Sequence, residues 1–407
     1  MNLIIFLVGL LILVQLMLKS WLKVHGIPGI ISFIMLGFLL SAADHQWHFF
    51  TAAGRDILEF LANIGLITLL FRIGLESDIS QLWCQLKRAS LILVGDVGIS
   101  ALSGFMVSRF LLGMPVIPSM FVGLALSATS VGVSISIWER AGKLKTESGE
   151  LLLDVAELDD ISGIILMALL FTLIPVIREK GGESIFMTVL RSGGWILIKL
   201  LGFGLICAIF SRFLEESVTD FFQKIDVNPN TSMLLLGGFG FIIASLAVVF
   251  GFSLAIGAFF AGLAFSRDSD AVKLDTAFNG LDSLFSPFFF IGIGLRVDPA
   301  VLTQAIFPAV ILILTAFISK ILADGSGSLL FFPLKKSALI GLSMVPRAEI
   351  TMIIMQHGHR LGAWAVPAEL FAAVVSVVLL TCLITPLIIQ KLLNRITLTS
   401  VQSDTKG

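Results

Sequence analysis

Long apolar stretches follow one another along almost the whole of this 407-residue chain. A helix needs about 20 predominantly apolar residues to cross the hydrocarbon core of a bilayer. Only 14% of the residues are charged, whereas a soluble domain has about 25%, so a water-soluble body of this size would lack polar surface. The sequence therefore predicts an all-α polytopic membrane protein with about 13 transmembrane helices. The predicted spans are 2–18, 25–42, 56–74, 88–112, 115–138, 147–176, 190–213, 232–250, 253–266, 281–296, 299–330, 336–358 and 366–392.

Short connections join these spans, which indicates a single membrane domain over residues 1–393. The polar residues 394–407 are predicted to form a short cytoplasmic tail, and we expect no cytosolic regulatory domain. The first span lacks the basic start and the small-residue cleavage site of a signal peptide, so we expect it to be retained as a helix. A net charge of −1 provides no basic patch for nucleic acid, and the lipid bilayer is the expected surrounding.

The positively charged residues indicate how the chain is oriented. Cytoplasmic segments of membrane proteins carry an excess of Lys and Arg. With the N-terminus outside, 16 of the 27 Lys and Arg residues fall in cytoplasmic segments, 7 in outer segments and 4 within spans. The sequence thus predicts a multi-pass protein of the cell membrane with its N-terminus outside and its C-terminus in the cytoplasm.

Thirteen spans divide into six, one and six, so the second group of six begins on the opposite face of the membrane. This is the pattern of an inverted repeat, in which interrupted helices at matching positions mark the binding site. The fifth span contains the hydroxyl-rich run SATSVG at 127–132, and its counterpart contains SMVPRAE at 343–349. Pro346 removes a backbone donor there. We predict that both helices are interrupted; the alternative is that Gly and Pro are merely frequent in membrane helices.

Acidic residues gather on the sixth span. A charge at mid-membrane costs several kcal/mol, about 3 on insertion scales, so Asp159 and Asp160 are functional candidates. Adjacent helical residues point about 100° apart, so one carboxylate can meet a fixed cation while the other faces water. Asp154 and Glu157 precede them at three-residue spacing and are predicted to line an entrance from the cytoplasmic end.

Two adjacent carboxylates suit the exchange of a small cation for a proton. Na⁺ and K⁺ are hard cations that take oxygen ligands, and a carboxylate supplies both oxygen and charge. Burial raises a carboxyl pKa and a nearby cation lowers it, so such a site can be poised near neutral pH. A proton and a metal ion then exclude each other. The competing interpretation is a buried ion pair that only holds helices together.

Three cationic residues are candidate partners for these acids: Lys320, Arg347 and Arg72. Lys320 has two simpler explanations, a local bond to Asp324 one turn on or a side chain that extends to the interface. Arg347 can instead pair with Glu349 beside the Pro346 break.

Other polar residues have more ordinary explanations. Arg72 is predicted to anchor the third span together with Glu76 and Asp78, and Asp96 is a single acid in the fourth span without an assigned partner. The 3 cysteines are too few for a disulfide framework, and the 5 histidines show no metal-ligand spacing. We predict no cofactor.

Seven segments, taken together, resemble the monovalent cation:proton antiporter-2 family, which includes bacterial Na⁺/H⁺ and K⁺/H⁺ exchangers. They occur in family order across nearly the full chain. They are HGIPG at 25–29, LLFRIGLE at 69–76, SATS at 127–130, LDDISG at 158–163, IGAFFAG at 256–262, PFFFIGIG at 287–294 and VPRAE at 345–349.

The resemblance implies the Na⁺/H⁺ antiporter fold, with inverted six-helix repeats and crossed broken helices. It implies a homodimer in which an ion-translocating core (about 87–176 and 299–393) moves against a dimer-forming scaffold (about 1–86 and 232–298), with a linker helix at about 190–213. It also implies that Asp160 binds the cation and that Asp159 forms a proton-sensitive ion pair with Lys320. Thr129 and Ser130 are expected beside them at the helix crossing.

The paired-aspartate form is similar to the electrogenic Na⁺/H⁺ branch, whereas Kef-type potassium exchangers more often carry Gln-Asp and have a nucleotide-binding domain. Two positions depart from the family pattern. Ala348 stands where Gly is usual, and Glu157 adds an acid where small or apolar residues are usual. The second departure leaves ion choice and proton stoichiometry open.

The leading hypothesis is a secondary transporter, not an enzyme, that exchanges Na⁺, with Li⁺ or K⁺ as other candidates, for H⁺ by alternating access. The alternatives are a K⁺/H⁺ exchanger and a Na⁺-coupled carrier of organic anions. The acidic stripe disfavours an anionic substrate. An intramembrane aspartyl protease would place its two acids on different helices, and a channel would need a filter-like loop, which we do not find.

Overall fold

The computed structural model describes residues 2–24, 28–48, 50–76, 79–130, 132–179, 185–213, 229–266 and 271–404. Within these ranges every regular element is a helix, so the all-α prediction is confirmed. Parts of three sequence motifs, residues 25–27, Asp78 and Val131, lie outside the described residues.

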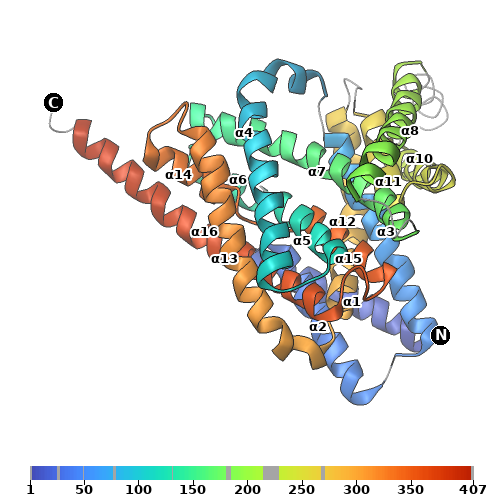
Figure 1. Cartoon of the computed structure of the whole chain (residues 1–407). Helices are drawn as coiled ribbons and strands as arrows, with labels where there is room; N and C mark the ends of the chain where they lie inside the picture. Colours follow the sequence, from blue (N-terminus) through green and yellow to red (C-terminus); the bar gives the residue numbers. More distant parts are fainter. Residues whose placement is uncertain are drawn as a thin grey trace. The chain divides into compact units, whose positions relative to one another are not determined.

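The helices follow the chain in the order shown in Figure 1. The first half contains α1 (Asn2–Val24), α2 (Gly29–Trp47), α3 (Ala52–Glu76), α4 (Ile79–Met106) with a π-helical turn η1 (Val107–Leu111), α5 (Val116–Ser127), α6 (Gly132–Arg140) and α7 (Glu147–Glu179). The second half contains α8 (Ile185–Phe213), α10 (Pro229–Val249), α11 (Leu254–Ala264), α12 (Ala271–Leu295), η2 (Pro299–Val301), α13 (Leu302–Ser328), α14 (Leu334–Ser343), α15 (Glu349–Leu361) and α16 (Ala368–Asp404).

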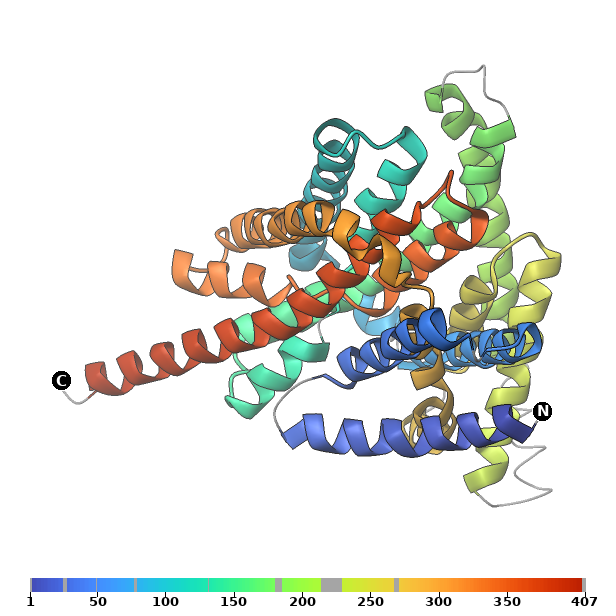
Figure 2. The ribbon, with the colours of Figure 1, turned by 90° about the horizontal axis from the view of Figure 1, so that it is seen from below.

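Six helices in the described part are long and apolar enough to cross a membrane, and shorter apolar helices accompany them. The chain is therefore a multi-pass membrane protein, while thirteen crossings remain a prediction. Several helices extend beyond their predicted spans, among them α4, α12 and α16. The helix α4 begins at Ile79, and α16 continues as one long helix to Asp404 (Figure 2) because no Gly or Pro between 393 and 404 ends it.

The chain separates into two compact units. The first unit comprises Met1–Ser20, Ser32–Ile79 and Ile165–Arg296; the second comprises Trp21–Ile31, Ser80–Ile164 and Val297–Gly407. The boundary divides α7 after Ile164. The assignment of one part as a moving core and another as a static scaffold remains a prediction.

Glycines set the close packing of α3 against α11 in the first unit. A Cβ atom added at Gly74 would meet the carbonyl oxygen of Phe259, and one added at Gly262 would meet that of Phe71. The two backbones thus approach at two reciprocal positions, as small residues permit in membrane helices.

This packing predicts that Gly262→Leu destabilises the protein. The added side chain must displace backbone atoms of α3, and overpacking costs about 1–3 kcal/mol. We expect a lower midpoint of thermal unfolding in detergent. Gly238→Leu is the matched control, because Gly238 has nothing within 4 Å of an added Cβ; equal midpoints for the two variants would contradict the prediction.

Phenylalanine rings fill the interior of the first unit. The chain has 34 Phe and no Tyr. Phe71 on α3 lies 4.8 Å from the ring of Phe278, and Phe203 on α8 makes an edge contact with Phe260 at 5.6 Å. Such pairs stabilise beyond their buried area, and Phe, unlike Tyr, brings no hydroxyl group that would need a partner.

The second unit brings the interrupted helices together. Here α13 packs against α14 and α16, α5 packs against α15, and α6 packs against α16. One apolar cluster joins α4, α6, α7, α14 and α16 through Ile92, Trp138, Leu152, Ile340 and Ile389. Burial of these side chains holds the helix ends that build the site.

Candidate functional site

Two helix breaks cross in the second unit. The helix α5 ends at Ser127 and α6 begins at Gly132, while α14 ends at Ser343 and α15 begins at Glu349. The predicted interruptions are therefore confirmed. The backbone N–H of Ser130 donates to the carbonyl oxygen of Pro346 at 2.9 Å, so the two breaks touch.

Side chains satisfy main-chain groups that the breaks leave free, which buried helix ends require. The hydroxyl of Ser134 donates to the Ser343 carbonyl oxygen at 2.7 Å. The hydroxyl of Thr351 donates to the Ala125 carbonyl oxygen at 2.9 Å. The indole of Trp138 donates to the Ser343 hydroxyl at 2.9 Å. The crossing is thus fixed by hydrogen bonds between the two broken helices.

Arg347 joins the ends of both broken helices. Its Nη1 atom donates to the carbonyl oxygens of Ala128 at 3.0 Å and Met344 at 3.4 Å, and to the Thr129 hydroxyl at 3.2 Å. Ala128 and Met344 cap the C-termini of α5 and α14. A helix C-terminus carries partial negative charge, so this fully buried cation stabilises two of them at once.

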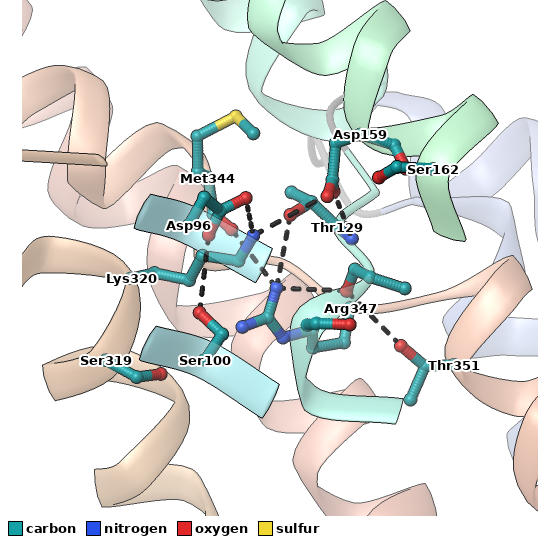
Figure 3. Close-up of polar contacts among 12 residues, drawn as sticks. Asp96, Ser100, Thr129, Asp159, Ser162, Ser319, Lys320, Met344, Arg347 and Thr351 are labelled. Carbon is teal, nitrogen blue, oxygen red and sulfur yellow. Dashed lines mark hydrogen bonds and ion pairs between the residues drawn. The ribbon is translucent and has the colours of Figure 1, made fainter. Parts of the chain in front are cut away.

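Asp159 enters the same cluster from α7 (Figure 3). Its side chain is 1% exposed. Its Oδ2 atom accepts the backbone N–H of Thr129 at 2.8 Å and lies 3.8 Å from the Lys320 ammonium. Its Oδ1 atom accepts no hydrogen bond from any described residue.

Lys320 pairs most closely with Asp96, the single acid that the sequence left without a partner. Both side chains are fully buried, and the Ser100 hydroxyl donates to the second Asp96 oxygen at 3.3 Å. Both simpler explanations of Lys320 are therefore wrong. The ammonium does not extend to an interface, and Asp324 accepts no hydrogen bond from it.

A signal for this pair was present in the sequence. An acid within the apolar α4 is too costly unless a cation meets it, and Lys320 is a cation with apolar residues on both sides. The sequence alone does not show that α4 and α13 lie close together.

The remaining predicted residues lie on α7 and at the helix crossing, and they differ in exposure. Asp160 and Asp154 are partly exposed, and Glu157 is exposed. Thr129 and Ser130 are buried at the break, and the Ser130 hydroxyl donates to Glu349 Oε2 at 2.8 Å. The two adjacent aspartates therefore differ in how far they are buried.

Arg72 belongs to the first unit. It forms ion pairs with Glu76 at 2.7 Å and with Asp282 at 3.0 Å. The second partner was not predicted from the sequence, because it lies on α12, 210 positions along the chain. These contacts give Arg72 a structural role between α3 and α12.

The described residues contain no group of three or more His, Cys, Asp or Glu side chains with metal-ligating geometry. A cation at Asp159 and Asp160 would therefore also need hydroxyl, carbonyl or water oxygens. Thr129, whose backbone N–H binds Asp159, also carries a hydroxyl group at this break.

Crossed broken helices that enclose a buried acid–lysine cluster define a class of membrane transporter in which unwound segments form the ion site. The family model described as "Sodium/hydrogen exchanger, transmembrane" matches residues 4–395, and the chain belongs to this family. It is 29% identical over 380 residues to the Na⁺/H⁺-K⁺ antiporter GerN of Bacillus cereus, covering 92% of this chain and 93% of that protein. It is 27% identical to a Na⁺/H⁺ antiporter of Enterococcus hirae, covering 90% and 91%.

The fold matches a solved structure as well. The sodium proton antiporter MjNhaP1 from Methanocaldococcus jannaschii at pH 8 superposes with a TM-score of 0.67 at 18% identity, covering 96% of this chain and 98% of that one. The predicted antiporter fold is confirmed. Cation–proton exchange is the activity that the family indicates.

Proposed function

We propose that this protein exchanges Na⁺ for protons by alternating access, with Asp160 and Asp159 as the shared cation and proton site. One observation carries the proposal: adjacent aspartates on α7, one buried 3.8 Å from Lys320 and the other partly exposed to water. The exposed carboxylate takes up an ion from water. The buried carboxylate, that of Asp159, compensates the positive charge of Lys320.

Exchange follows from competition at the carboxylates. A metal ion needs deprotonated ligands, so proton and cation displace each other. Moving the empty site across the membrane would expose uncompensated charge to a medium of low dielectric, which is costly. Only the loaded forms then cross, and the fluxes of cation and proton are coupled.

The Lys and Arg distribution supports an N-out, C-in orientation in the cell membrane. The resemblance to the antiporter family supports a homodimer in which the unit that holds the site moves against a scaffold. Asp154 and Glu157, which precede Asp160 on α7, are assigned to the cytoplasmic entrance. Arg347 and Glu349 are assigned to stabilising the helix crossing, so that its geometry depends on the charges nearby.

A K⁺/H⁺ exchanger is the second candidate, because the similar protein GerN is a Na⁺/H⁺-K⁺ antiporter by name. A Na⁺-coupled carrier of organic anions is less well supported, since Lys320 is paired with Asp96 and the Arg347 guanidinium is fully buried with Nη1 bound to a protein carbonyl. Comparing Na⁺, Li⁺ and K⁺ in one assay separates these candidates.

The test uses purified protein in vesicles with an imposed pH gradient. We expect Na⁺ to dissipate the gradient, and the concentration of Na⁺ for half-maximal rate to rise as pH falls, because protons occupy the carboxylates at low pH. One competing proton gives up to about a tenfold rise per pH unit. Choline is the control for ionic strength. If none of Na⁺, Li⁺ and K⁺ dissipates the gradient, the exchange of monovalent metal ions is refuted.

A further inference from the structure

Asp324 is a buried acid that the exchange mechanism does not use. It lies on α13, one helical turn after Lys320, and its side chain is 0% exposed. Neither of its oxygens accepts a hydrogen bond from an N–H or O–H group of the described residues. A buried carboxylate in this condition is among the most unfavourable groups a protein can contain.

Lys320 is already paired, whereas Arg347 is engaged only through Nη1, since its Nε and Nη2 atoms donate to none of the described residues. Lys320 contacts Asp96 and lies 3.8 Å from Asp159. Arg347 directs Nη1 to two carbonyls and a hydroxyl. Asp96, Asp159 and Asp324 all interact electrostatically with this guanidinium. Two buried cations thus face three buried aspartates, and one negative charge is left uncompensated if all three are ionised.

Asp324 follows Lys320 by one helical turn and Lys320 contacts Asp96, so the carboxyl groups of Asp324 and Asp96 belong to one buried cluster and interact with each other. Two carboxylates in contact repel each other, whereas a carboxylic acid and a carboxylate form a strong hydrogen bond. Asp96 is the anion of the pair, because it accepts from the Lys320 ammonium and from the Ser100 hydroxyl. Asp324, which accepts from neither, is the group that can carry the proton.

We propose that Asp324 and Asp96 share a proton and form a second proton-binding site, separate from the Asp159–Asp160 pair. The proton resides on Asp324 and is donated to an oxygen of Asp96. No covalent bond other than this O–H is made or broken, and the proton comes from water. When this proton is bound, Asp96 remains the anion that pairs with Lys320. The cluster then contains two cations, Lys320 and Arg347, and two anions, Asp96 and Asp159.

Asp159, Lys320 and Arg347 are the other charged groups facing Asp324. When Asp324 loses its proton, the added negative charge beside Asp96 draws Lys320 away from Asp159. The second site therefore links external pH to the pairing of Lys320. It does not require Asp324 to touch the transported cation.

Infrared spectroscopy of purified protein in Na⁺-free buffer near neutral pH tests this directly, without any transport measurement. We expect the wild-type spectrum to contain the C=O stretching band of a protonated carboxylic acid that moves to lower frequency in D₂O. Asp324→Asn, which has the shape of the protonated acid, should lose the intensity of one such group. Asp56→Asn, which makes the same change at an exposed position on α3, is the control and should retain it.

Equal carboxylic acid bands in wild type and Asp324→Asn would overturn the proposal. If Asp324→Asn does not give a monodisperse protein, Asp96→Asn supplies the test. This change leaves two buried cations facing two aspartates, so Asp324 should lose its proton to pair with Lys320, and its carboxylic acid band should disappear. An unchanged band in Asp96→Asn would also overturn the shared proton, whereas failure of Na⁺-driven exchange in vesicles would leave it standing.

Discussion

Vesicles containing Asp160→Asn should show no Na⁺-dependent dissipation of a pH gradient above the protein-free background. Asn keeps the size and one neutral oxygen of the side chain but loses both the charge and the site of protonation. A charge-assisted interaction contributes about 1.5–3 kcal/mol, so its loss weakens cation binding by about 10- to 100-fold. Loss of the titrating group also removes the coupling itself.

Glu157→Gln is the matched control for this experiment. Glu157 lies on α7 three residues before Asp160, and its side chain is exposed. The control therefore also removes one carboxylate from α7, but at an exposed position. We expect a change of less than a few-fold, because charges at exposed positions are screened. Asp159→Asn should reduce exchange and change its pH profile, since it leaves Lys320 with Asp96 alone. Full activity in Asp160→Asn would remove that residue from the transport site.

The helix breaks were predictable because their causes are local. A run of hydroxyls before Gly132, and Pro346 with its missing N–H, weaken the helix at the positions where α5 and α14 end. Membrane insertion was predictable for a similar reason, since length and composition of a segment decide it. Neither inference needed knowledge of which helices are neighbours.

The partners of Lys320 were not predictable in the same way. Asp324, four residues on, was the nearest acid along the chain, yet the ammonium contacts Asp96, which is 224 positions away. That choice depends on the packing of α4, α7 and α13 in one unit, which periodicity alone does not reveal. A local i,i+4 pair contributes only about 0.2–0.5 kcal/mol, so burial of an acid elsewhere easily overrides it.

Arg347 physically links the crossing to the proposed ion site. Its guanidinium stabilises the negative ends of α5 and α14, and it also interacts with the charge of Asp159. A change of charge on Asp159, through binding of a proton or cation, therefore alters the forces on the two breaks. The unwound segments are the part of the site best able to respond, because they lack the regular hydrogen bonds of a helix.

Lys320→Gln should lower the midpoint of thermal unfolding in detergent strongly, and Asp96→Asn in the same chain should restore most of the loss. Removing one partner of a buried ion pair costs about 3–5 kcal/mol, because the other charge remains buried and unpaired. Removing both leaves two neutral side chains, Gln and Asn, that can hydrogen-bond to each other. The structure therefore identifies Asp96 as the acid that needs Lys320 most.

The comparison variant is Lys320→Gln with Asp159→Asn. Asp159 lies 3.8 Å from the ammonium and accepts the Thr129 N–H, so it is less dependent on Lys320 than Asp96 is. Its replacement also weakens that hydrogen bond, and rescue should be smaller. A higher midpoint for this double variant than for Lys320→Gln with Asp96→Asn would show that Asp159 is the main partner of the lysine, and the role of Asp96 as its anchoring anion would then be rejected.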